Sequence, residues 1–126
     1  MVMRSKLEKL MDVLYSVSNQ CGNGAYFAKP SRITRASNMG WDEALLFLDF
    51  LAERNLVKKE TYMGDKRSHE GYVMEEAGKK MLKAYGVFKE AEDYDTARDA
   101  YIKMCRIAEG DNILKSLEEA FTQRQK

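Results

Sequence analysis

Residues 30–63 carry the main architectural information of the chain and read PSRITRASNMGWDEALLFLDFLAERNLVKKETYM. Pro30 fits the first turn of a short helix, where its missing N–H costs nothing, and Ile33 and Ala36 can point inward from that helix. Residues 37–40, Ser-Asn-Met-Gly, then predict a tight turn. A longer helix is expected next, because apolar residues recur within about one third of the helical wheel. They are Trp41, Ala44, Leu45, Leu48, Leu51, Ala52 and Leu56.

Beyond this helix the periodicity changes from helical to extended. Residues 57–63 include β-branched and aromatic side chains and predict a strand. Residues 64–71 are polar and bounded by glycines, which predicts a loop, and residues 72–74 predict a short returning strand. A short helix, a turn and a longer helix form a helix-turn-helix, and a hairpin with a charged tip after them is a wing. The expected fold class is therefore mainly α (α+β), a winged helix-turn-helix with a C-terminal helical extension.

A helix is also expected before this segment. Ser5 and Glu8 have the spacing of a capping box, in which each side chain bonds the other residue's backbone N–H. Apolar residues then recur at helical intervals, namely Leu7, Leu10, Met11, Leu14 and Val17.

The chain after residue 75 is predicted to be helical. Two apolar seams with coiled-coil spacing lie within residues 77–108, and they are out of phase where Asp93 and Asp95 lie. Two helices that meet there, with an aspartate as N-cap, are favoured over one helix with a stammer. Residues 110–111, Gly-Asp, are expected to end one helix and cap a last one. We therefore expect a winged domain at residues 1–82 and a C-terminal helical hairpin, or dimerisation segment, at residues 83–126.

Composition limits the possible functions. The 126 residues hold 21 Lys and Arg against 20 Asp and Glu, a net charge of +1, which excludes a strongly basic nucleic-acid binder. Between Asp12 and Asp42, however, there is no acidic residue, whereas Lys29, Arg32 and Arg35 fall in that interval. The N-terminus lacks the apolar core of a signal peptide, no apolar run is long enough for a membrane span, and there are two cysteines. These features predict a cytoplasmic protein in a reducing compartment.

The central segment resembles small archaeal winged helix-turn-helix transcriptional regulators. The resemblance covers roughly residues 27–82 and is strongest at 31–33 (Ser-Arg-Ile) and 38–41 (Asn-Met-Gly-Trp). The end of the long helix at 51–57 and the segment 76–82 after the wing also match. This resemblance implies binding to double-stranded DNA and a homodimer joined through C-terminal helices. The chain departs from the family in interrupting its C-terminal helix near Asp93.

Cationic and polar residues of the predicted domain are candidates for DNA contact. Arg32 and Arg35 share one face of the short helix, which in this fold crosses the DNA backbone, so they are expected to bind phosphates. The alternative is that both are solvated surface arginines. Ser37 and Asn38 lie at the turn and are expected to approach the groove, although Asn38 can equally cap a helix. Wing cations are phosphate contacts or merely a solvated tip. The full set is Lys29, Arg32, Arg35, Ser37, Asn38, Lys58, Lys66 and Arg67.

The face of the long helix that should read bases argues against a simple recognition helix. It is predicted to expose Asp42, Glu43, Leu46, Asp49, Phe50 and Glu53, whereas Trp41 is predicted to lie in the core. Carboxylates near phosphates repel them. Either the helix N-terminus alone touches DNA, or this face is buried against a partner subunit or the C-terminal helices. An alternative function follows, a winged-helix protein-interaction module that binds a partner through Leu46 and Phe50 without binding DNA.

The C-terminal aromatic and apolar residues predict a homodimer interface. The expected interface residues are Ala84, Phe88, Tyr94, Tyr101, Met104, Leu117 and Phe121. The alternative is that these helices fold back onto the first helix within one monomer. His69 is the one histidine, and neither a glycine-rich phosphate loop nor a catalytic triad is recognisable. No enzymatic activity, cofactor, metal or membrane partner is therefore expected.

Overall fold

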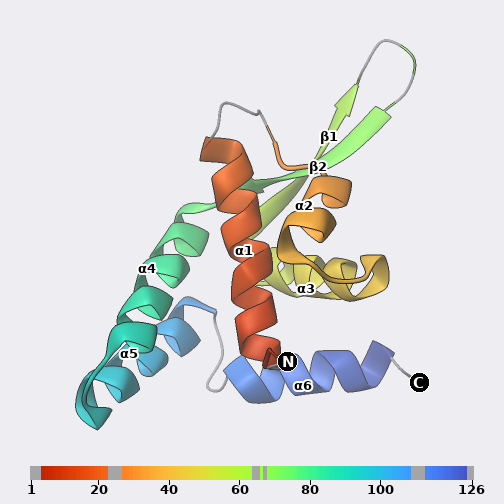
Figure 1. The fold of residues 1–126 in the computed structure, drawn as a ribbon. Coiled ribbons are helices and arrows are strands. Elements are labelled where there is room, and N and C mark those ends of the chain that lie inside the picture. Colours follow the sequence, from red (N-terminus) through yellow and green to blue (C-terminus); the bar gives the residue numbers. More distant parts are fainter. Residues whose placement is uncertain (1–3, 23–26, 64–65, 67, 109–112, 125–126) are drawn as a thin grey trace.

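The computed structural model describes residues 4–22, 27–63, 66, 68–108 and 113–124. None of the helices in this part of the chain combines the length and apolar character needed to cross a membrane. Within the described residues, six helices and one two-stranded antiparallel sheet follow one another in the expected order, and the fold class predicted from the sequence is confirmed (Figure 1). The elements are α1 (Lys6–Gly22), α2 (Pro30–Ser37), α3 (Trp41–Glu53), β1 (Val57–Met63), β2 (Ser68–Met74), α4 (Glu76–Glu90), α5 (Tyr94–Ile107) and α6 (Ile113–Arg124).

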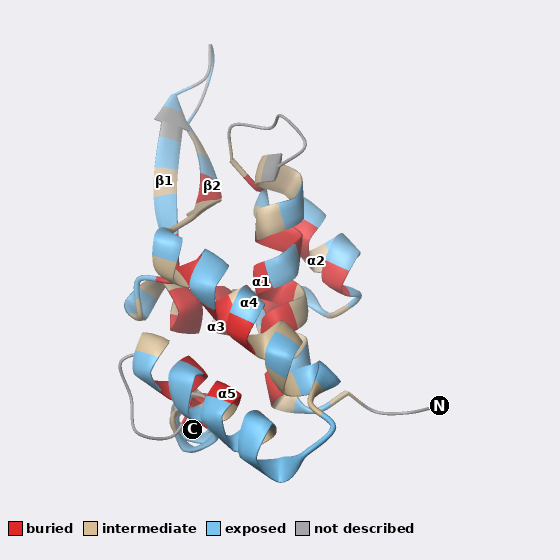
Figure 2. Ribbon diagram, turned by 90° about the vertical axis from the view of Figure 1, so that its left-hand side faces the viewer, coloured by how far each residue is buried: buried red, intermediate tan, exposed pale blue. Residues whose placement is uncertain are grey.

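Helix α1 is the central element of the fold. It contacts α2, α3, β2, α4 and α6, and its position between these elements is visible in Figure 1. The predicted capping box is confirmed: the Glu8 N–H donates to Ser5 Oγ at 3.1 Å and the Ser5 N–H donates to Glu8 Oε1 at 3.3 Å. Figure 2 shows that the buried residues gather on α1, α3 and the adjoining face of α4, whereas α5 is exposed over most of its surface.

Helices α2 and α3 form the helix-turn-helix. Pro30 occupies the first turn of α2, and Ile33 is fully buried as expected. The prediction for Ala36 is wrong, because this residue is exposed. A helix of two turns that contacts α1, α3 and β2 buries only a narrow strip, and Ala36 lies outside it. The chain reverses at Asn38, whose φ of 54° is left-handed, and α3 then begins at Trp41 after the N-cap residue Gly40.

Strands β1 and β2 form the wing. They pair from Val57 opposite Met74 to Met63 opposite Ser68, so β1 has the predicted bounds. The predicted loop at residues 64–71 was too long, since β2 begins at Ser68 rather than at residue 72. Backbone pairing needs no apolar side chain, and the ladder therefore continues through a polar stretch that the hydrophobic pattern excluded.

A second backbone contact attaches the segment before α2 to the wing. The Ala28 N–H donates to the Tyr72 carbonyl at 2.8 Å, and the Tyr72 N–H donates to the Ala28 carbonyl at 2.9 Å. Gly71 permits this approach, because a Cβ added there would overlap Cδ2 of the Phe27 ring. Because no side chain other than hydrogen fits beside that ring, Gly71 is required by packing.

Helices α4 and α5 form an antiparallel hairpin at one edge of the molecule (Figure 1). Two separate helices were predicted at this position, and this is confirmed. Asp93 is the N-cap of α5: the Thr96 N–H donates to its Oδ1 at 2.7 Å, and the Thr96 hydroxyl donates to its Oδ2 at 2.9 Å. The backbone hydrogen bond from Thr96 lowers the pKa of Asp93 below its ordinary value of 3.8. The cap predicted at residues 110–111 lies outside the described residues.

Helix α6 returns to the body of the molecule. It contacts α1 and α3, and the rings of Phe47 and Phe121 lie 4.9 Å apart between their centroids. Lys6 Nζ and Glu118 Oε2, 2.9 Å apart, join α6 to the first turn of α1. Helix α4 runs without interruption across the predicted domain boundary at residue 82. The winged domain and the C-terminal helices therefore share one core.

Candidate nucleic-acid interface

Lys29, Arg32 and Arg35 form a cationic surface on and just before α2, which we call the α2 cation face. All three side chains are exposed, and none of the described carboxylates forms an ion pair with any of them. The first turn of α2 contains no acidic residue. Cations without a carboxylate partner are free to pair with phosphate oxygens, so this surface is able to bind a polyanion.

Arg4 fixes the helix-turn-helix turn to α1. Its Nη1 donates to the Ser37 carbonyl and its Nη2 to the Asn38 carbonyl, both at 2.8 Å. Nη1 also lies 2.6 Å from Oδ2 of Asp12, which neutralises the guanidinium. Sequence reasoning missed Arg4, because two of its partners are backbone carbonyls more than thirty residues away and leave no pattern in the sequence. The turn between α2 and α3 is therefore held by a tertiary contact.

Ser37 was wrongly predicted to contact DNA. It is 2% exposed, and its hydroxyl donates to the Ile33 carbonyl at 2.6 Å. A serine near a helix end can satisfy its hydroxyl on the preceding turn, and Ser37 does so while facing the core. Asn38 is exposed and caps the C-terminus of α2 through its backbone, since its N–H donates to the Arg35 carbonyl at 3.2 Å. Contact between the Asn38 side chain and DNA remains a prediction.

The orientation of α3 differs from the predicted one. Trp41, predicted to be in the core, is 50% exposed, whereas Phe50, predicted to be exposed, is 1% exposed. The reason is that α6 packs on α3, so α3 buries a different arc from the one the helical wheel suggested. The Arg54 guanidinium lies 3.8 Å from the centroid of the Phe50 ring. Leu46 is also partly buried against the core, so α3 does not expose Leu46 and Phe50 together as the protein-interaction alternative requires.

A cleft of about 470 Å³ lies between α3 and the wing, and we call it the wing cleft. Lys59 Nζ and Glu70 Oε2 lie 3.4 Å apart on its wing side. Burial raises the pKa of the Tyr72 phenol, and the negative charges of Asp49 and Glu70 raise it further. The lining of the cleft therefore combines aromatic side chains with two carboxylates, of which Glu70 is paired with Lys59. It is lined by Pro30, Trp41, Leu45, Asp49, Lys59, Ser68, His69, Glu70 and Tyr72.

The wing cations are exposed but less free than those of α2. Lys58 Nζ lies 3.6 Å from Oε1 of Glu60, and both groups are at the surface, where such pairs contribute little stability. Exchange of that carboxylate for a phosphate therefore costs little. Lys66 is exposed near the tip of the hairpin. Arg67, also predicted to contact DNA, lies outside the described residues.

Most of the predicted dimer-interface residues face the interior of one subunit. Ala84, Met104, Leu117 and Phe121 are buried, and the rings of Phe88 and Tyr101, both partly buried, lie 6.0 Å apart. Tyr94 differs from them, since it is 76% exposed. Helices α4, α5 and α6 cover these side chains within the chain, as in the monomeric alternative. A dimer that preserves this structure requires other contacts.

Among the described residues, no group of three or more His, Cys, Asp or Glu side chains is placed to hold a metal ion. A protein-family model described as winged helix-turn-helix matches residues 3–93, and the chain belongs to this family. This match extends from just before α1 to the end of the α4–α5 turn and includes the α2 cation face and the wing cleft. Neither the comparison with curated proteins nor the comparison with solved structures gave a match.

Proposed function

We propose that the protein is a cytoplasmic transcriptional regulator of the archaeal winged-helix type that binds double-stranded DNA and has no catalytic activity. The observation that carries this proposal is the α2 cation face, three exposed cations without described carboxylate partners, next to a helix-turn-helix turn. In proteins with this motif, the first helix of the pair crosses the DNA backbone while the second lies in the major groove. The cations are therefore positioned to bind phosphates.

Binding to the DNA backbone and contact with base edges are assigned to different groups. Lys29, Arg32 and Arg35 bind phosphates on one side, and the wing cations Lys58 and Lys66 bind phosphates on the other. Contacts of this kind fix the orientation of the protein on the duplex without reading sequence. Asn38 lies at the turn and is exposed, so its amide can reach a base edge or a phosphate.

The test is a titration of a DNA duplex at several salt concentrations, with wild-type protein and a variant carrying Arg32→Ala and Arg35→Ala. If each arginine binds one phosphate, removal of both makes the plot of log affinity against log salt shallower by about 1.8 per subunit. The matched control carries Lys89→Ala and Arg106→Ala, which removes the same charge from exposed positions on α4 and α5. No binding by the wild type at low salt, or equal slopes for both variants, would overturn the proposal.

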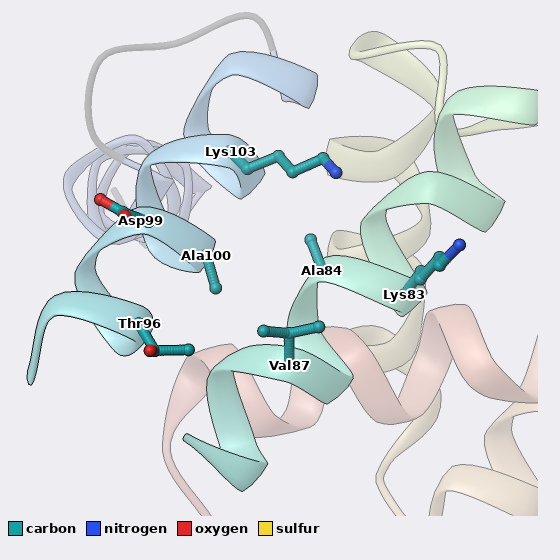
Figure 3. Close-up of a pocket in the computed structure, with 7 residues that line it drawn as sticks. All are labelled: Lys83, Ala84, Val87, Thr96, Asp99, Ala100 and Lys103. Carbon is teal, nitrogen blue, oxygen red and sulfur yellow. The ribbon is translucent and has the colours of Figure 1, made fainter. Parts of the chain in front are cut away.

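We also propose that the protein forms a homodimer, through the open side of the α4–α5 hairpin. A groove of about 310 Å³ runs between these helices. Figure 3 shows Ala84, Val87, Thr96 and Ala100 directed into the space between α4 and α5, and Lys103 extending towards α4. Helix α5 packs mainly against α4 and hardly touches the other elements. The side of the hairpin that faces away from the rest of the chain is therefore open to a second copy.

The charges at this groove support pairing with an identical surface. Lys83 and Lys103 are exposed at its rim, and so is Asp99, whose carboxylate points away from α4 in Figure 3. A two-fold interface brings the same surface from both copies together, so a rim with both signs of charge can complement itself. Val87 is 48% exposed at the centre and supplies apolar area. Tyr94, at the start of α5, is 76% exposed and is available for such a contact.

Sedimentation equilibrium measures this association. Val87→Lys would place a charge at the centre of the interface and is expected to weaken dimerisation at least about tenfold. Ile102→Lys is the matched control, because Ile102 is also an exposed apolar residue of the hairpin but does not line the groove. A wild-type protein that stays monomeric, or equal effects of the two substitutions, would contradict this interface.

A further inference from the structure

We propose that the wing cleft reads base edges that carry hydrogen-bond donors, through Asp49, and thymine methyl groups, through Trp41 and Leu45. The favoured edges are the amino groups of cytosine and adenine in the major groove. This inference rests on the proposed binding of duplex DNA and states what kind of sequence the protein selects.

The three residues that α3 contributes to the cleft lie on one face of the helix. Trp41, Leu45 and Asp49 are spaced four residues apart and all line the space between α3 and the wing. Trp41 is half exposed, and Leu45 and Asp49 are partly exposed. In the proposed complex the second helix of the motif lies in the major groove, so side chains on this face of α3 are placed to contact base edges.

This face accepts hydrogen bonds but offers none of the usual cationic donors. An ionised aspartate is an acceptor only, whereas the most frequent specific contact to guanine needs an arginine or lysine that donates to O6 and N7. Residues 41–53 of α3 contain no lysine or arginine. Arg54 follows the helix, and its guanidinium lies over the Phe50 ring. The α3 face of the cleft therefore lacks the means of binding guanine and is suited to amino groups.

Asp49 lines the cleft, is partly exposed and already takes part in an interaction within the subunit. A carboxylate can accept several hydrogen bonds at once, so a partner within the subunit does not prevent it from accepting a further bond from a ligand. Its charge acts on the cleft, since it contributes to raising the pKa of Tyr72 on the opposite wall.

The arrangement of charge also explains how a carboxylate is tolerated at a DNA interface. On the wing side, Lys59 lies 3.4 Å from Glu70 and reduces the repulsion that this second carboxylate exerts. Pro30, which follows Lys29 in the chain, also lines the cleft. In the proposed complex the cations of α2 and of the wing attract the DNA backbone, and the α3 side of the cleft faces the bases. A carboxylate at this position therefore weakens binding to every sequence and restores it only where an amino group donates to it. The carboxylate therefore increases specificity and lowers the affinity for DNA in general.

The proposal is tested by selecting duplexes from a library with a randomised central segment, with wild-type protein and with Asp49→Asn and Asp49→Ala. The wild type is expected to enrich cytosine or adenine at one position by roughly tenfold to a hundredfold over guanine. Asp49→Asn should shift that position towards adenine, to which an asparagine amide bonds in two places. Asp49→Ala should lose the preference and bind unselected duplex more tightly.

Asp42→Asn is the matched control, since it removes the same charge from the first turn of α3 at an exposed position that does not line the cleft. It should leave the selected sequence unchanged. Leu45→Ala provides a second test. It should reduce the enrichment of thymine and leave the base preference at the position that Asp49 contacts unchanged. Circular dichroism confirms that each variant is folded.

The outcomes separate this inference from the proposed function. If the wild type binds duplex with a steep salt dependence but enriches no sequence, base reading by the cleft is wrong and DNA binding stands. If wild type and Asp49→Ala enrich the same sequence, base reading by Asp49 is likewise wrong and DNA binding stands. If the wild type binds no duplex, both proposals fail.

Discussion

The molecule contains two pairs of helices joined by short turns, and they are held in different ways. In the α2–α3 pair, the turn is fixed from outside by Arg4, and α3 is packed between α1 and α6. In the α4–α5 pair, the turn is fixed by Asp93 through bonds to Thr96, and α5 rests mainly on α4. The first pair is therefore positioned by the whole fold, which suits the proposed role of α2 and α3 in contacting a DNA duplex. The second pair is stabilised locally and keeps an open side.

The largest effect is expected where the fold holds α3. Phe47→Ala would remove a fully buried ring that faces Phe121, and the loss of stability should be about 3–5 kcal/mol. Phe88→Ala on the α4–α5 hairpin removes a ring that is only partly buried and should cost less. Urea unfolding of both variants measures the difference. Equal losses would mean that the two helix pairs are equally integrated into the core.

A smaller effect is expected at the anchor of the α2–α3 turn. Arg4→Ala would leave the carbonyls of Ser37 and Asn38 without this donor and Asp12 without its cation, at a cost of about 1–2 kcal/mol. Lys9→Ala is the control, because it removes a single ion pair, Lys9 to Glu43, from the same helix and should cost less than about 1 kcal/mol. Thermal unfolding distinguishes them, and an Arg4 variant no weaker than the control would show that the turn does not need its anchor.

The smallest effect is expected at the local cap of α5. Because hydrogen bonds from Thr96 lower the pKa of Asp93 in the folded protein, its contribution to stability is complete above the ordinary pKa of 3.8 and declines as the pH falls below that value. Asp93→Asn should lose this part of the acid dependence while retaining a side-chain oxygen for the cap. Unfolding measured from pH 6 to pH 2 tests it. An unchanged acid dependence would exclude a role for this carboxyl group.

Patterns with short range were predicted well from the sequence. The capping box at Ser5, the bounds of β1 and the N-cap at Asp93 depend on neighbouring residues, and all are confirmed. The errors at Trp41 and Phe50 have a different origin. A helical wheel shows that a helix has an apolar arc but not which other elements cover it, and α6, which packs on α3, begins at Ile113.

The residues of the candidate site likewise fall into those that the sequence predicts and those that depend on the tertiary structure. Exposed cations on α2 followed from the acid-free interval around them, because charge distribution is visible in the sequence. Ser37 was misassigned, since its burial depends on how α2 lies against its neighbours. Arg4 and the wing cleft were not predicted at all. Both are assembled from segments that only the tertiary structure brings together.

The missing side chain at Gly71 gives the hairpin a mechanical role. The Phe27 ring fills that space and the Ala28–Tyr72 bridge lies beside it, so β2 and the residue before Lys29 are joined by a ring contact and by two backbone hydrogen bonds. In the proposed complex with DNA, we therefore expect a tilt of the hairpin to shift Lys29 as well, and the wing contact and the α2 contact to respond together.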